Sequence, residues 1–191
     1  IFEAQHQKGT IAYSTDLMMQ MIQETCDELY RNGIKHILLV SGHGGNNSFI
    51  SFFCQSQLSK KRNYAVINFT PDDTKIEEEA RKLKKTEMDA HAGETESSMI
   101  FAIRPELVDT VAAKNESGRD QNRLGEMPYA STAIWWYAKF PNHYGGDGSY
   151  ASKELGNFLI DNYASQLVEL IKYLKDNNTV LELQNEFFER Q

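Results

Sequence analysis

The sequence has few cysteines and no long apolar run, which disulfide-rich and membrane-spanning proteins need. Only two of its 191 residues are cysteine, Cys26 and Cys54, and they do not form a Cys-x-x-Cys pair. A disulfide framework is therefore excluded, and a reducing, cytoplasmic setting is expected. No run of about 18 apolar residues occurs, which rules out a membrane-spanning segment.

The first residues lack an initiating Met, a basic stretch and the apolar core of a signal peptide. The opening, Ile-Phe-Glu-Ala-Gln-His-Gln-Lys, reads like the interior of a protein. We therefore expect further residues upstream of position 1.

Positive charge is also in short supply. The chain has 20 Lys and Arg against 27 Asp and Glu, which gives a formal net charge of −7. This excess of acid argues against a nucleic-acid partner. The 40% apolar and 25% charged residues are typical of a globular protein. We expect one domain over residues 1–191, with 177–191 as a C-terminal arm.

Hydrophobic periodicity predicts an α/β fold. Helical spacing covers 15–32, with Thr15 as N-cap, and short apolar runs at 36–40 and 64–69 are typical of buried parallel strands. Helix, strand, glycine-rich loop, helix and strand then alternate. Further expected elements are helices over 47–59, 71–85, 93–103 and 152–175, a strand over 108–113 and long loops over 114–150.

The first candidate site is Ser-Gly-His-Gly-Gly-Asn-Asn, residues 41–47, where the first strand ends. Ligands of α/β sheets bind beyond the carboxyl ends of the strands. Glycines allow close backbone approach, and the imidazole of His43 can bind a metal or carry a proton. A tight turn with a solvated His43, or a phosphate-binding nest, are the alternatives. The usual phosphate-loop spacings are absent.

The second candidate site is Asp-Ala-His-Ala-Gly-Glu-Thr-Glu, residues 89–96, at an expected helix start. Asp89 is close enough in sequence to hold one nitrogen of His91 and fix its tautomer. The alternative is structural, because Glu94 and Glu96 near a helix N-terminus favour the helix dipole without any ligand.

Other reactive side chains are weaker candidates. Ser41 lacks the Gly-x-Ser-x-Gly context of a nucleophile. Cys54 is expected in the core. Trp135 and Trp136 lie in the loop region, where one can pack while the other lines a pocket. His143 is a candidate ligand, with a solvated or capping role as its alternative.

Four segments together resemble the creatininase, or creatinine amidohydrolase, family. Residues 41–46 are similar to its Asn-Gly-His-Gly-Gly-Asn motif, and 89–98 to its Asp-x-His-Ala-Gly-x-x-Glu-Thr-Ser motif. Residues 143–156 are similar to its C-terminal Gly-x-Pro-x-x-Ala-x-x-Glu-x-Gly stretch, with Gly148 in place of proline. Near the start, 5–11 match a stretch that ends in Gly-Thr-Ile.

The resemblance implies a layered α/β/α fold with a mainly parallel central sheet, assembled as a homohexamer. It also implies two divalent metal ions (zinc, manganese or iron) and hydrolysis of a C–N bond in a small amide or cyclic amide. His43 and Glu96 would be metal ligands, and His91 with Asp89 the catalytic pair. The residues expected to contact the substrate are Gly44, Gly45, Asn46 and Glu94.

The chain departs from the family pattern at several positions, and these departures leave its function open. Creatininase itself has a Glu at the position of Gly45, so the chain resembles a broader branch of the family. The family's N-terminal Glu-x-His pair and bridging Asp have no counterpart in residues 1–191. A non-catalytic member that binds metal or ligand, and a structural subunit that uses Phe187 and Phe188 for assembly, are therefore the alternatives to an enzyme.

In the enzyme reading, metal-activated water attacks the amide carbon. His91 then gives a proton to the leaving nitrogen, and the backbone N–H groups of Gly44 and Gly45 hold the oxyanion.

Overall fold

The computed structural model describes residues 2–191, apart from the side chain of residue 75. Its contacts divide the chain into two compact units. One combines the described residues up to Ala12 with Asp72–Ser165, and the other combines Tyr13–Pro71 with Gln166–Gln191. The expected C-terminal arm belongs to the second unit. Within the described part of the chain, no helix has the length and apolar character needed to cross a membrane.

The second unit is built on a two-stranded parallel sheet, as the sequence predicts. Strand β1 (His36–Leu39) pairs in register with β2 (Ala65–Asn68). Helix α1 (Thr15–Arg31) precedes β1, and α2 (Asn47–Ser56) connects β1 to β2. Cys26, Ile37, Phe53 and Tyr64 form the buried core between these helices and the strands. Burial raises the pKa of the Cys26 thiol to about 11, so this cysteine is a core residue and not a nucleophile.

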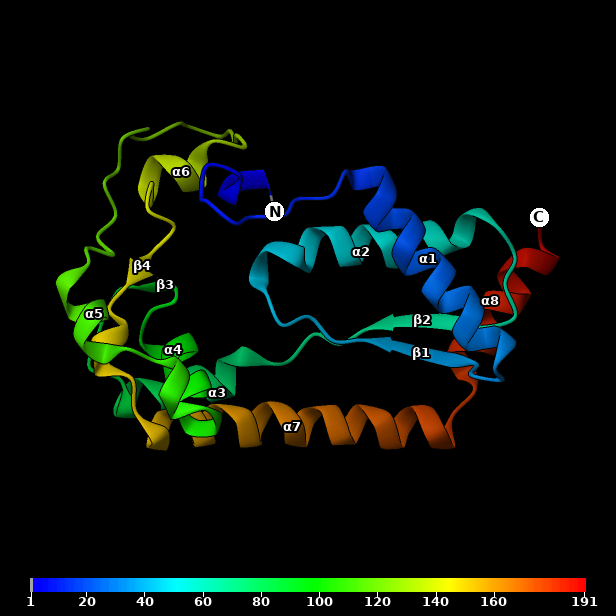
Figure 1. Ribbon diagram of the computed structural model, residues 1–191. Helices are drawn as coiled ribbons and strands as arrows, with labels where there is room; N and C mark the ends of the chain where they lie inside the picture. The colour runs from blue at the N-terminus through cyan, green and yellow to red at the C-terminus, as the bar shows by residue number, and fades with distance from the viewer. Residues whose placement is uncertain (1) are drawn as a thin grey trace. The chain divides into compact units, whose positions relative to one another are not determined.

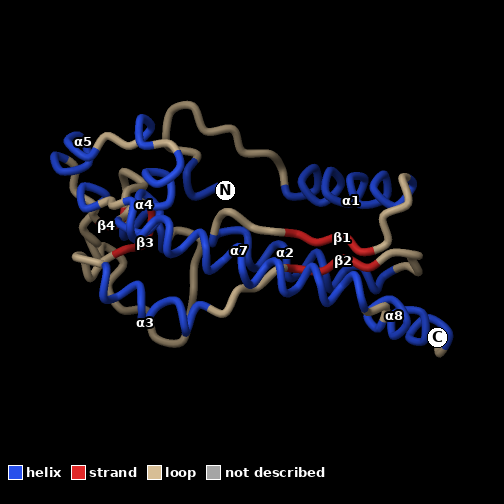
Figure 2. The backbone as a smooth tube through the Cα atoms, turned by 90° about the horizontal axis from the view of Figure 1, so that it is seen from below, coloured by secondary structure: helices blue, strands red, loops and turns tan. Residues whose placement is uncertain are grey.

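Successive side chains of β1 point to opposite faces of the sheet, and both faces are covered by helices. Ile37 and Leu39 point to the core of α1 and α2, whereas His36 and Leu38 line a hollow with residues of the last turns of α7 (Lys153–Asp176). Figures 1 and 2 show the end of α7 on the side of the sheet opposite to α1 and α2. The second unit is therefore a small α/β/α sandwich.

The C-terminal segment folds as α8 (Thr179–Glu189) and packs on its own unit. The side-chain amide of Gln184 donates to the carbonyl oxygens of Arg62 and Tyr64, at 3.0 and 2.9 Å. These bonds tie the helix to the start of β2. Phe187 and Phe188 contact each other edge to face, and Phe187 is 41% exposed.

The first unit holds the second sequence motif. Helix α3 (Asp73–Leu83), strand β3 (Asp89–His91) and helix α4 (Glu94–Ile103) follow one another along the chain. Strand β4 (Gly145–Gly146) returns to pair antiparallel with β3. The buried core of this unit joins α3 to the first part of α7 through Ile76, Ala80, Leu155 and Leu159.

Two local expectations were wrong. Residues 108–113 do not form a strand but lead into α5 (Thr110–Asn115), because Asp109 accepts the N–H groups of Val111 and Ala112 and caps a helix. Segment 114–150 is mostly loop, as expected, and α6 (Trp135–Lys139) and β4 are among its few regular elements. The N-cap of α1 is Ser14, one residue before the expected Thr15.

Helices α4 and α7 approach so closely at Gly156 that a side chain does not fit. A Cβ atom there would lie 2.0 Å from the carbonyl oxygen of Ser98 and 2.8 Å from the Cβ of Ala102. We expect Gly156→Ala to lower the free energy of unfolding by about 3 kcal/mol, because the helices must separate. Urea unfolding measures this loss. Asn157→Ala, at the next and exposed position of α7, is the matched control, and equal losses in both variants would contradict the prediction.

Candidate functional site

The first motif forms an exposed turn after β1. His43 is extended and is followed by a single 3-10 turn, Gly44–Asn46, that leads into α2. The Ser41 hydroxyl donates to the carbonyl oxygen of His43 at 2.8 Å and accepts its N–H, which fixes the backbone of the histidine. Since Gly44 and Gly45 begin a helical run, their N–H groups have no acceptor within the helix. Their predicted role toward an oxyanion stays a prediction.

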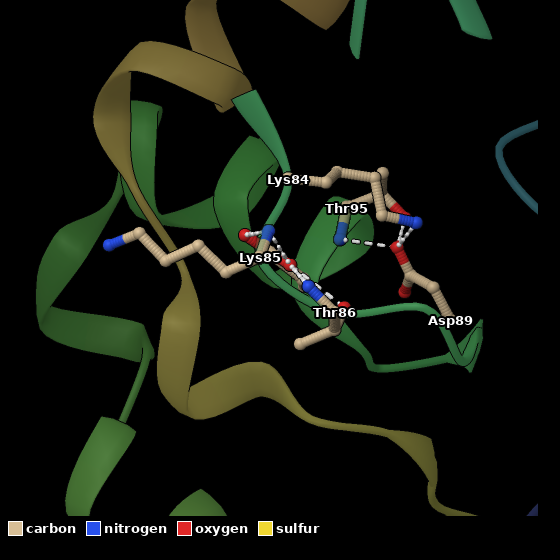
Figure 3. Close-up of polar contacts among 6 residues, drawn as sticks. Lys84, Lys85, Thr86, Asp89 and Thr95 are labelled. Atoms are coloured by element: carbon tan, nitrogen blue, oxygen red, sulfur yellow. Dashed lines mark hydrogen bonds and ion pairs between the residues drawn. The ribbon is translucent and has the colours of Figure 1, made fainter. Parts of the chain in front are cut away.

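Asp89 of the second motif is held by residues around it (Figure 3). Its Oδ2 accepts the N–H of Thr95 at 3.0 Å and the Thr95 hydroxyl at 2.5 Å. The same oxygen lies 2.8 Å from the Lys84 ammonium, and the Asp89 side chain is only 5% exposed. The carboxylate therefore ties the end of α3 to the first turn of α4, and the partner that the sequence assigned to it, His91, is not needed to explain its position.

Glu94 is the most deeply buried charged group of the motif. It is 1% exposed, and its two oxygens accept the N–H of Lys85, the N–H of Thr86 and the Thr86 hydroxyl at 2.8 to 3.0 Å. Because these donors occupy both oxygens, the side chain holds the loop between α3 and β3. The expected contact between Glu94 and a substrate finds no support in this arrangement.

His91 and Glu96 come together at the site. Nδ1 of His91 lies 3.5 Å from Oε2 of Glu96, which also accepts the N–H of Ala92 at 2.7 Å. Both side chains remain partly accessible to solvent. The carboxylate beside His91 is thus Glu96. A carboxylate on one imidazole nitrogen fixes the tautomer and the orientation of the ring.

Two aromatic residues that the sequence left unassigned contact His91. The ring centroid of His143 is 4.6 Å from that of His91, and the centroid of Trp136 is 5.9 Å away. The indole N–H of Trp136 donates to Nδ1 of His143 at 2.9 Å. Trp136, not Trp135, is therefore the tryptophan next to the motif.

A cleft of about 830 Å³ opens beside α4 in the same unit. Its lining includes the apolar side chains of Ile76, Met99 and Leu159 and the carboxylates of Asp89 and Glu96. Tyr163 also lines the cleft and donates to Oδ1 of Asp73 at 3.1 Å. Burial, reinforced by this carboxylate, raises the pKa of Tyr163 to about 12, so the phenol stays protonated at neutral pH. The volume is in the range of small-molecule sites.

The described residues do not complete a metal site. No group of three or more His, Cys, Asp or Glu side chains within residues 2–191 has an arrangement that could hold an ion. The two expected ligands, His43 and Glu96, belong to separately described units. A catalytic zinc site uses about three protein ligands. Neither unit by itself supplies such a set.

Sequence reasoning missed Lys84 and did not assign Trp136 or His143. The signal for His143 was present, because it begins the segment 143–156 that resembles the family's C-terminal stretch. Pairing of β3 with β4 places Gly145 opposite His91 and so brings this segment to the motif. No periodicity reveals such a pairing.

Comparison with known families confirms the family resemblance. The sequence model of the creatininase family, described as creatinine amidohydrolase, matches residues 2–171. All four segments singled out in the sequence lie within that range. No curated protein sequence matches the chain.

Solved structures share the fold at low sequence identity. A protein from Bacteroides fragilis, described as a creatinine amidohydrolase, matches with a TM-score of 0.72 and 18% identity, over 90% of this chain and 66% of that one. A manganese form of creatininase matches with a TM-score of 0.65 and 19% identity, over 87% and 67%. A mutant creatininase complexed with creatine matches with a TM-score of 0.66. The chain thus spans about two thirds of the length of these structures and has the creatininase α/β fold.

Proposed function

Since the chain belongs to the creatininase family, we propose that the protein hydrolyses the C–N bond of a small amide or cyclic amide. The observation that carries the proposal is the pairing of His91 with Glu96. It puts a proton-transferring imidazole beside a carboxylate at the motif where the family resemblance is most specific. The cleft next to Glu96 has room for a small substrate.

The residues of the first unit have separate tasks in this reaction. Because Nδ1 of His91 faces Glu96, its Nε2 is the nitrogen that takes a proton from the water as it adds and then gives that proton to the leaving amine. Water adds to the carbonyl carbon, the C–N bond breaks, and the products are a carboxylic acid and an amine. Asp89 and Glu94 act as positioning residues, since they fix the chain on both sides of β3.

Dependence on divalent metal is part of the proposal, with His43 and Glu96 as ligands. Its support is the chemistry of the two side chains, which suits zinc, manganese and iron alike. Structures with manganese and with two zinc ions are known for creatininases that share this fold. Assembly as a homohexamer in the cytoplasm likewise remains a prediction.

Elemental analysis after dialysis, followed by assays on small cyclic amides, tests this function. We expect one or two divalent ions per chain, release of amine or carboxylic acid, and loss of both metal and turnover in His43→Ala. The matched control is His36→Ala, because His36 lies in β1 of the same unit outside the motif. Metal retained equally in His43→Ala would remove His43 from the ligands. Absence of turnover on any amide with metal bound would favour a non-catalytic binding protein.

A further inference from the structure

Trp136 fixes the orientation of the ring of His143. The indole of Trp136 only donates, so Nδ1 of His143 must be the acceptor of their 2.9 Å hydrogen bond. A neutral His143 therefore carries its proton on Nε2. The indole also packs on Phe140, with ring centroids 4.9 Å apart, which holds the donor in place.

The backbone of His143 adopts a conformation that residues other than glycine rarely take. Its φ angle is +64°, in the left-handed region. The N–H of His143 donates to the carbonyl oxygen of Phe140 at 2.9 Å, and the side-chain amide of Asn142 donates to Ser117 at 3.1 Å. Such conformations persist only where surrounding contacts enforce them, and they cluster at functional sites.

The ring held in this way lies against His91. The two imidazoles meet at an interplanar angle of 65° with centroids 4.6 Å apart, and Trp136 meets His91 edge to face. His91 is thus bounded by Glu96 at Nδ1 and by His143 and Trp136 at its ring. Free rotation of His91 about its side-chain bonds is restricted from both directions.

We propose that His143, oriented by Trp136, is a positioning residue that keeps the imidazole of His91 turned with Nδ1 toward Glu96. This inference rests on the proposed function in taking His91 as the proton donor. It goes beyond that function in assigning the loop 140–146 and α6 a part in the site. His143 does not need to touch the substrate for this role.

Three variants separate the contributions. His143→Asn keeps an acceptor for the indole N–H and tolerates the left-handed backbone, but removes the ring beside His91. Trp136→Phe removes the donor and keeps a smaller aromatic ring at the position. Trp135→Phe is the matched control, because it makes the same change at the neighbouring position of α6, where Trp135 contacts Trp136 edge to face.

The decisive readout is the tautomer of His91, measured by long-range proton–nitrogen NMR correlation on protein labelled with ¹⁵N-histidine. We expect mainly the Nδ1–H form in the unmodified protein and in Trp135→Phe. In His143→Asn and Trp136→Phe we expect a mixture of tautomers. Outer partners of a functional histidine typically change activity about 10- to 100-fold, so kcat should fall by that factor while KM stays nearly constant.

A double-mutant cycle that combines His143→Asn with His91→Ala gives a second test. If His143 acts through His91, His143→Asn lowers kcat much less when His91 is already absent. An unchanged His91 tautomer in both His143→Asn and Trp136→Phe would overturn the proposal. If the tautomer depends on His143 but no amide is hydrolysed, the positioning role stands and the proposed function fails, so the two failures are distinguishable.

Discussion

Replacing His91 by alanine should lower kcat by a factor of about 10² to 10⁴, the usual contribution of a general acid or base. The imidazole has both a carboxylate partner and partial access to solvent. The content of bound metal should change little, because His91 is expected to move a proton and not to hold an ion. Steady-state kinetics and elemental analysis on the same preparation measure both quantities.

Glu96→Gln and Glu106→Gln form a matched pair of variants that tests the same prediction. Glu96→Gln keeps the size of the side chain and an acceptor for the N–H of Ala92, but removes the charge beside His91. Because Glu96 is also a proposed metal ligand, its metal content is measured together with kcat. Glu106→Gln makes the same change at an exposed position just after α4 and should leave kcat unaltered. If His91→Ala loses metal as well as activity, His91 is a ligand and its assignment as proton donor is wrong.

Replacing Glu94 by alanine should lower the free energy of unfolding by about 3 kcal/mol or more, because hydrogen bonds to a charged group are strong and their loss leaves buried donors without partners. The N–H groups of Lys85 and Thr86 would lose their acceptor inside the protein. Glu94→Gln should cost less, since one acceptor oxygen remains. Urea unfolding followed by circular dichroism measures the differences.

Glu79→Ala is the control for this change. Glu79 is an exposed residue of α3 that pairs with Lys82, and such surface pairs contribute about 0 to 1 kcal/mol. A loss in Glu94→Ala no larger than in Glu79→Ala would show that the loop between α3 and β3 does not depend on the buried carboxylate. That loop leads directly to Asp89, which is a proposed positioning residue of the site. We therefore also expect Glu94→Gln to lower activity, even though its loss of stability is modest.

Local sequence signals determined much of the second unit. The apolar spacing of 15–32 and the stop at Asn32 and Gly33 predict α1 closely, because a helical stripe and a residue with positive φ are local features. The short apolar runs likewise predict β1 and β2 and their parallel pairing. The same signals fail at 108–113, where apolar residues suggest a strand but the capping side chain of Asp109 begins a helix.

At the candidate site, the order and spacing of the sequence motifs predicted which segments form the site, and the sequence predicted a helix start at Gly93. Only the tertiary structure decided what each side chain does. The burial of Glu94, the pairing of Asp89 with Lys84 and the contact between His91 and His143 join residues that no period or spacing relates. They depend on the return of β4 to β3 and on the packing of α4 against α7, which are properties of the folded chain.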